Sequence, residues 1–178
     1  MDSKQIYKIL KNDTNVSKLN FLGVFPIDLI PLSAMKFPCC LVINTKPHDH
    51  PGEHWICLVK CENRRAIYFD SFGIPPFNLP EVGDILSNCD EWTFNETRLQ
   101  STFSTVCGQY VTFFLTHFAK GYTLEHIVEL LNNDRDLEAN DAIIFNYIKN
   151  KYPDVDELSN LEIIDFPFIF TQVSSPVS

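Results

Sequence analysis

One cysteine in this sequence stands where a thiol is chemically most reactive, at the start of a buried helix. Cys107 opens residues 107–120, a stretch that is apolar nearly all round a predicted helix. The N-terminus of such a helix presents unpaired N–H groups and the positive end of the helix dipole, which lower the pKa of a thiol. Gly108 would let a substrate backbone approach. A buried core cysteine is the alternative interpretation of these residues alone.

A histidine and an aspartate flank a hairpin predicted over residues 54–70. A turn of three or five residues centred on Asn63 pairs Asp70 with Ile56, and places His54 two residues further along on the same face. Such diagonal neighbours lie about 7–8 Å apart between Cα atoms, within reach of an imidazole–carboxylate hydrogen bond. A four-residue turn would put the two side chains on opposite faces, and they would then be unrelated surface and strand-end residues.

Two further residues could complete a site for nucleophilic catalysis. Gln100 precedes Cys107 by seven residues, and its amide can donate to an oxyanion together with the backbone N–H of Cys107. Trp55, next to His54, would wall the substrate cleft. A glutamine in a loop indicates little by itself, so its weight comes from this spacing.

Together, these residues stand in an order that resembles the adenovirus-type cysteine endopeptidases (the adenain family), and more distantly the SUMO-type proteases. The order is His54-Trp55, Asp70, Gln100, Cys107-Gly108. The likeness covers roughly residues 18–121 and continues more weakly to about residue 150. The spacing from glutamine to cysteine is that of the adenovirus type. SUMO-type proteases usually have one residue fewer and an aspartate before the cysteine, where this chain has Val106.

The resemblance implies a permuted papain-like α+β fold, in which the nucleophile leads a central helix packed on a mostly antiparallel sheet. It implies hydrolysis of peptide bonds through a thioester, with Cys107 as nucleophile, His54 as its acid–base partner and Asp70 orienting the imidazole. Gln100 and the Cys107 N–H would hold the oxyanion. It also implies substrates with small residues, often Gly-Gly, at the cut, and the maturation of viral capsid precursors as the role.

The sequence departs from the family in two ways. Asp70 stands where the adenovirus enzymes mostly have glutamate, and either carboxylate can orient an imidazole. Those enzymes are basic and use DNA as a cofactor, whereas this chain has a net charge of −9, so we expect no strong nucleic-acid binding. They are also stimulated by a peptide that adds a strand and can be disulfide-linked. Cys89, eleven residues before Gln100, stands in a similar place, although a buried helix-end thiol is the simpler interpretation.

Helices and strands of an α+β protein must position these residues. The predicted elements are helices over 3–11 (capped by Ser3), 79–88, 107–120, 123–132 and 136–151, and strands over 40–45, 54–61, 66–70 and 92–99. Residues 21–38 are broken by glycine and prolines, which predicts an irregular loop or short edge pieces. At 178 residues we expect one domain, residues 1–178, with an apolar tail over about 160–178 that the pattern does not place.

Composition excludes several classes of protein. Apolar residues make up 45 % of the chain, which excludes intrinsic disorder, and its longest apolar run is too short to cross a membrane. Six cysteines without C-x-x-C spacing, and no secretory signal, predict free thiols in a reducing compartment, the cytosol or nucleus. The resemblance to the adenovirus type implies that this is the cytoplasm or nucleus of a host, and the virion. His48, His50, Glu53 and His54 crowd together, but they lack the spacing of a metal site, so we expect no metal.

Two other functions are compatible with the same residues. A SUMO- or ubiquitin-like-protein protease would use the same chemistry on a folded modifier with a Gly-Gly tail. A degenerate protease fold that serves as a capsid or scaffold part would have no activity, although every catalytic position here is filled. We expect a monomer that needs no cofactor, apart from a possible activating peptide.

Overall fold

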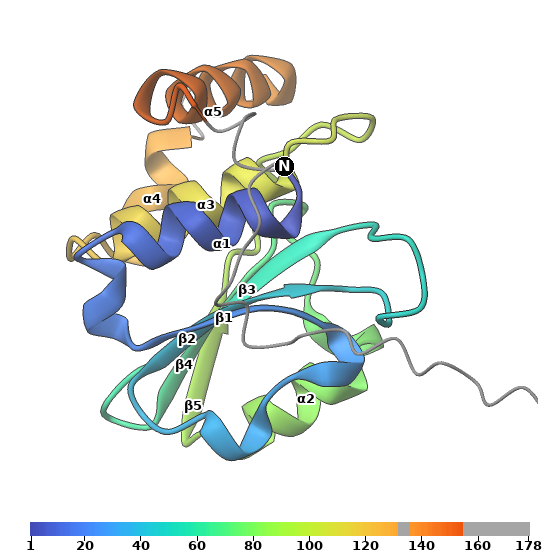
Figure 1. Ribbon diagram of the computed structural model, residues 1–178, viewed down its shortest axis with the longest axis vertical. Coiled ribbons are helices and arrows are strands. Elements are labelled where there is room, and N and C mark those ends of the chain that lie inside the picture. The colour runs from blue at the N-terminus through green and yellow to red at the C-terminus, as the bar shows by residue number, and fades with distance from the viewer. Residues whose placement is uncertain (132–135, 155–178) are drawn as a thin grey trace, which may run out of the picture.

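Within the residues that the computed structural model describes, 1–131 and 136–154, a five-stranded sheet forms the centre of the fold (Figure 1). In spatial and chain order its strands are β1 (Phe21–Pro26), β2 (Cys39–Asn44), β3 (Trp55–Lys60), β4 (Arg65–Phe69) and β5 (Glu91–Phe94). The three central strands are antiparallel, as predicted, whereas β1 and β5 run parallel to their neighbours β2 and β4.

Helices cover both faces of this sheet. One face carries α1 (Ser3–Asn12) and α3 (Cys107–Phe118), against which α4 (Leu124–Leu131) and α5 (Leu137–Lys151) pack. The other face carries α2 (Pro80–Ser87), seen below the sheet in Figure 1. Short 3-10 turns complete the described part: η1 (Val16–Leu19), η2 (Ile27–Leu29), η3 (Leu32–Ala34) and η4 (Pro76–Asn78). The predicted α+β class, with a central helix led by Cys107, is confirmed.

The continuous apolar sequence of the central strands follows from these two covered faces. In β2, Cys40 and Val42 face the α3 side, while Leu41 and Ile43 face the α2 side. A strand covered on both sides must be apolar at successive positions, because neither face meets water. On the α3 side, the ring of Phe114 stacks on Phe69 of β4 with centroids 4.4 Å apart. This packing fixes the height of α3, and hence of its first residue, over the sheet.

The β3–β4 hairpin has the odd register that the site requires. Cys57 pairs with Phe69, and the turn comprises the three residues 62–64. Arg64 adopts the left-handed conformation (φ 59°), as the third residue of such turns usually does. The N–H of Cys61 closes the turn by donating to the carbonyl of residue 65 at 2.7 Å. The predicted alignment of the two strands is therefore confirmed.

Three details differ from the expectations. Asp2, not Ser3, caps α1, because the Asp2 carboxylate accepts from the Gln5 N–H while the Gln5 side chain accepts from the Asp2 N–H, a capping box. Residues 21–26 form an edge strand instead of an irregular loop, with a bulge between Phe21 and Gly23 in its pairing with β2. The strand predicted over residues 92–99 is the shorter β5, since the chain turns away after Phe94.

The apolar tail over residues 160–178 lies outside the described residues. In the part of the chain that is described, no helix combines the length and apolar character that crossing a membrane requires.

Candidate active site

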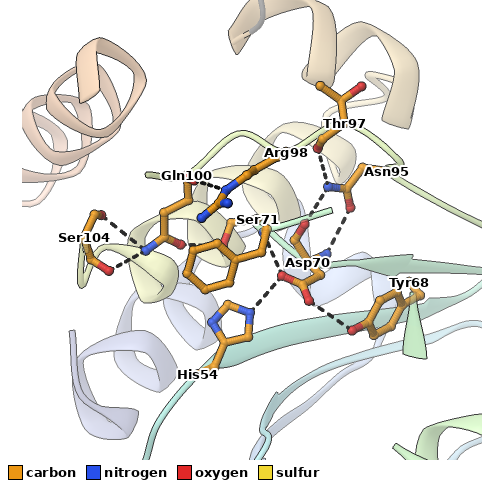
Figure 2. A network of polar contacts seen from close by, with 10 residues as sticks. His54, Tyr68, Asp70, Ser71, Asn95, Thr97, Arg98, Gln100 and Ser104 are labelled. Atoms are coloured by element: carbon orange, nitrogen blue, oxygen red, sulfur yellow. Dashed lines mark hydrogen bonds and ion pairs between the residues drawn. The ribbon is translucent and has the colours of Figure 1, made fainter. Parts of the chain in front are cut away.

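The hairpin brings His54 and Asp70 together at one end of the sheet (Figure 2). His54 directly precedes β3, and Asp70 directly follows β4. His54 Nε2 lies 2.8 Å from Asp70 Oδ1, which is the hydrogen bond expected from the register. Asp70 is only 3 % exposed, so its contact with the imidazole is little screened by water. The ring of Phe72 lies against the imidazole, with centroids 4.7 Å apart.

Asp70 is held on its side chain and on its backbone. Its Oδ1 also accepts from the N–H of Phe72 at 2.8 Å, and its Oδ2 accepts from the hydroxyl of Tyr68 at 3.4 Å. Asn95, which is buried, accepts from the Asp70 N–H at 3.0 Å and donates to the Asp70 carbonyl through its own Nδ2 (Figure 2). The carboxylate is therefore fixed in orientation before any substrate binds.

Cys107 is the first residue of α3, the helix that packs on β3, and it approaches His54 from the helix side of the sheet. It is 8 % exposed, and its thiol lies near His54 and near the backbone at Trp55 and Gly108, each of which lowers its pKa. Because Nε2 of His54 is engaged with Asp70, Nδ1 is the ring nitrogen left to face the thiol. A cysteine of α3 and a histidine–aspartate pair of the sheet thus lie together in one site.

The pKa values of this pair shift in the directions that favour charge separation. Burial by itself raises the pKa of Cys107, but the hydrogen bonds from His54 and from the backbone outweigh it, so this pKa lies below its ordinary value. Burial lowers the pKa of His54, yet the hydrogen bonds to Asp70 and Cys107 raise it to about 9 overall. Both shifts therefore favour a thiolate–imidazolium pair over the neutral thiol and imidazole.

Replacing Asp70 with Asn should lower the pKa of His54, because it removes the negative charge that stabilises the imidazolium. The expected result is a His54 midpoint at about 9 in the parent and at least ~1 unit lower in Asp70→Asn. An NMR titration of the His54 ring protons measures both values. Since a neutral imidazole stabilises a thiolate less, alkylation of Cys107 should also need a higher pH in the variant. An unchanged midpoint would contradict the assigned role of Asp70.

Gln100 lies at the start of the loop that leads to Cys107, and it is fully buried (Figure 2). Its Oε1 accepts from the Ser71 hydroxyl at 2.6 Å. That bond turns Nε2 toward the loop, where Nε2 donates to the carbonyl of Ser104 at 2.9 Å and approaches the Ser104 hydroxyl at 3.2 Å. The Nε2 donors of Gln100 therefore point toward the loop that leads to Cys107.

Trp55 lines a cavity of about 550 Å³ beside the site. Its indole N–H donates to the carbonyl of Met1 at 3.2 Å, so the first residues of the chain form part of the cavity wall. The surroundings of Gly108 correct one expectation. A Cβ built there would lie 3.0 Å from the Met1 Cβ and 3.2 Å from the end of the Ile6 side chain. The space beside Gly108 is filled by the N-terminal segment, and the glycine allows α1 to pack rather than a substrate to approach.

Sequence reasoning missed the residues that support the site. Asn95 and Ser71 make the hydrogen bonds that fix Asp70 and Gln100, respectively. Both are buried polar residues next to candidate catalytic residues in space, but 25 and 29 positions away from their partners in sequence. The signal that could have found them is weak: an asparagine just after an edge strand, and a serine directly after Asp70.

The remaining candidates have other partners. Cys89 is half-buried after the end of α2, where its thiol donates to the carbonyl of Ile85, and burial raises its pKa. His48 and His50 pair with the neighbouring carboxylates of Asp28 and Asp49 instead of meeting at one point. Over the described ranges, no group of three or more histidine, cysteine or acidic side chains is placed to hold a metal ion.

The fold and the site together define a class of structure. It is an α+β fold in which a buried helix presents a cysteine to a histidine–aspartate pair on the sheet. Neither a family model nor a curated protein matches this sequence. Matching solved structures include the ASFV pS273R protease, with 21 % identity and a TM-score of 0.38, over 56 % of this chain and 40 % of that one. They also include ChlaDub1 from Chlamydia trachomatis, with 16 % identity and a TM-score of 0.48, over 67 % of this chain and 64 % of that one. Both likenesses concern the fold alone. The chain spans less than two thirds of the length of either protein.

Proposed function

We propose that this protein is a cysteine endopeptidase that hydrolyses peptide bonds through a thioester acyl-enzyme. The observation that carries the proposal is the His54–Asp70 hydrogen bond, with Asp70 buried, beside the Cys107 thiol whose pKa His54 lowers. The lowered pKa of Cys107 and the raised pKa of His54 both favour a nucleophilic thiolate with a protonated imidazole beside it. These are the two forms that acyl transfer to a thiol requires.

The proposed reaction has two halves. The Cys107 thiolate attacks the peptide carbonyl, and the His54 imidazolium gives its proton to the leaving amine, which departs as the C–N bond breaks. The neutral His54 then takes a proton from water, whose oxygen attacks the thioester and releases the acid and the thiolate. Asp70 keeps the imidazole in one orientation and stabilises its charge in both halves.

The oxyanion formed in each half needs donors, for which we propose the Gln100 amide and the backbone N–H of Cys107. The Gln100 amide already has its donors on the side of the loop that leads to Cys107. A substrate oxygen would replace the longer contact, that of Nε2 with the Ser104 hydroxyl.

Replacing Gln100 with Ala should cost roughly 2–4 kcal/mol of transition-state stabilisation, because one oxyanion donor is lost. The measurement is kcat/KM with a peptide that the parent cleaves. Because Gln100 also braces its loop, Ser71→Ala serves as the matched control: it loosens the amide without removing its donor, and a smaller loss is expected. A Gln100→Ala variant within twofold of the parent would exclude Gln100 from the site.

Labelling of the free thiols tests the proposed nucleophile and separates an enzyme from a non-catalytic structural protein. All six cysteines are free, and burial raises the pKa of Cys39, Cys40, Cys57, Cys61 and Cys89, whereas that of Cys107 is lowered. Iodoacetamide at pH 6.5, followed by mass mapping, should therefore label Cys107 at least about tenfold faster than Cys61 and Cys89, which are the two more exposed cysteines. Labelling no faster than that of Cys61 or Cys89 would argue for a structural protein.

The finer part of the proposal concerns the substrate. The resemblance to the adenovirus type supports cleavage at small residues such as Gly-Gly, in viral capsid precursors, and a SUMO- or ubiquitin-like modifier is the alternative partner. Incubation with candidate virion precursors and, in parallel, with SUMO fusions separates the two. Cleavage of the precursors by the parent but not by Cys107→Ala is the expected result, and cleavage of the fusions alone would favour the alternative.

We also propose that nucleic acid is not an activator. With a net charge of −9, the chain repels a polyanion at long range. Two adjacent basic residues at the hairpin turn, Arg64 and Arg65, form ion pairs with Asp90 and Glu91, respectively. Duplex DNA titrated into a cleavage assay at physiological salt should leave kcat/KM unchanged within about twofold. A large stimulation by DNA would contradict the charge argument, and a peptide that adds a strand to the sheet edge stays the proposed kind of activator.

A further inference from the structure

A loop beside the nucleophile presents an aromatic side chain to solvent. It joins Gln100 to Cys107 and projects past the start of α3 (Figure 1). Phe103 in this loop is 97 % exposed, more than any other large apolar side chain in the described ranges. A single exposed apolar residue is ordinary on a protein surface, so the surroundings of Phe103 decide whether it has a role.

Hydrogen bonds hold the chain on both sides of Phe103. Arg98 donates to the Thr102 hydroxyl and to the carbonyl of Gln100, each at 2.9 Å. On the other side, the Gln100 amide donates to the carbonyl of Ser104. Both neighbours of Phe103 are thus tied to the same short segment, and the phenyl group stands at the tip of a braced turn.

A second set of contacts ties the base of this loop to the body of the protein. The N–H of Ser101 donates to the Asp141 carboxylate of α5 at 3.2 Å. The Tyr110 hydroxyl of α3 bridges the carbonyl of Leu99, at 2.8 Å, and the same carboxylate, at 3.0 Å. Residues of two helices therefore fix the loop that carries Phe103 relative to Cys107.

We propose that Phe103 determines specificity by packing against an apolar side chain of the polypeptide substrate as that chain lies across Cys107. A loop whose backbone is held in place before binding loses little conformational freedom on contact, and burial of an aromatic ring contributes strongly to affinity. The residues around it are hydroxylated (Ser101, Thr102 and Ser104), so the loop offers one apolar contact and selects one apolar residue of the substrate. This inference rests on the proposed peptidase function and adds a substrate preference away from the scissile bond.

Phe77 provides a matched control for this inference. It is 81 % exposed and lies in η4, which packs against α2 on the face of the sheet opposite α3. Truncation of either phenylalanine removes an exposed ring, and only Phe103 belongs to the loop that leads to the nucleophile.

The test uses a library of tryptic peptides from a cell proteome, with cleavage sites mapped by mass spectrometry for the parent, Phe103→Ala, Phe103→Leu and Phe77→Ala. Phe103→Ala should lose about tenfold in kcat/KM and lose a preference for an apolar residue at one substrate position. Phe103→Leu should keep most of both, and Phe77→Ala should match the parent. The rate at which iodoacetamide labels Cys107 should be equal within twofold in all four, since the chemistry is untouched.

Each outcome separates this inference from the function on which it rests. If the parent cleaves peptides and Phe103→Ala gives the same rates and the same site profile, the inference is overturned and the peptidase stands. A fall in alkylation rate with Phe103→Ala would show that the loop acts on the nucleophile itself, which also overturns it. If the parent and every variant leave the library intact, the proposed function fails and this inference fails with it.

Discussion

Replacing Cys107 with Ala is expected to abolish peptide cleavage and to leave the fold intact. The change removes a single sulfur atom at the first position of α3, where Ala is the best helix former, so little packing or helix stability is lost. It also removes the atom that must form the thioester, for which no neighbouring side chain substitutes. The measurements are kcat/KM on the peptide library and the thermal unfolding midpoint.

Cys89→Ala is the matched control for this prediction, because it removes a free thiol at the end of α2 instead of at the candidate site. It should keep the activity of the parent. Cleavage by Cys107→Ala at a rate comparable to the parent, or loss of activity in Cys89→Ala alone, would mean that the nucleophile has been assigned to the wrong residue.

Replacing His54 with Ala should reduce kcat by roughly 10⁴–10⁶-fold, nearly as much as loss of the nucleophile. Without the imidazole, the Cys107 thiol loses the hydrogen bond and the positive charge that lower its pKa, and the leaving amine loses its proton donor. Because members of a catalytic unit do not act additively, the double variant His54→Ala, Cys107→Ala should be no less active than Cys107→Ala.

An exposed histidine gives the control for this prediction. His126 lies on α4 and makes no contact with Asp70 or Cys107 among the interactions of the described chain, so His126→Ala should behave like the parent. A loss of less than about tenfold in His54→Ala would show that the thiol is activated by some other group.

The parts of the site that depend on one helix or on two adjacent strands could be predicted from the sequence. In the hairpin, one choice of turn length fixes which residues share a face, so the pairing of His54 with Asp70 followed from counting along two strands. The start of α3 at Cys107 followed from a long apolar stretch, because a helix buried all round leaves a clear pattern. Both inferences depend on periodicity within one or two adjacent elements.

Contacts between distant segments left no such pattern. The parallel pairing of β1 with β2 and of β5 with β4 joins strands separated by long connections, which hydrophobic alternation does not report. The bonds from Asn95 to the Asp70 backbone, and the packing of Met1 against Gly108, likewise depend on how the whole chain folds. The expectation that Gly108 faces substrate failed for this reason, because the sequence does not reveal that α1 occupies that space.

Detection of an acyl group on Cys107 tests the central claim most directly. The most rapidly cleaved peptide of the library is mixed with excess protein, quenched in acid within one turnover, digested with pepsin and analysed by mass spectrometry. A thioester-linked acyl group of the N-terminal product on Cys107, absent from Cys107→Ala and released by hydroxylamine, is the predicted result. Cleavage with no such adduct, or with the acyl group on another residue, would contradict the assignment of Cys107, His54 and Asp70 as the catalytic site.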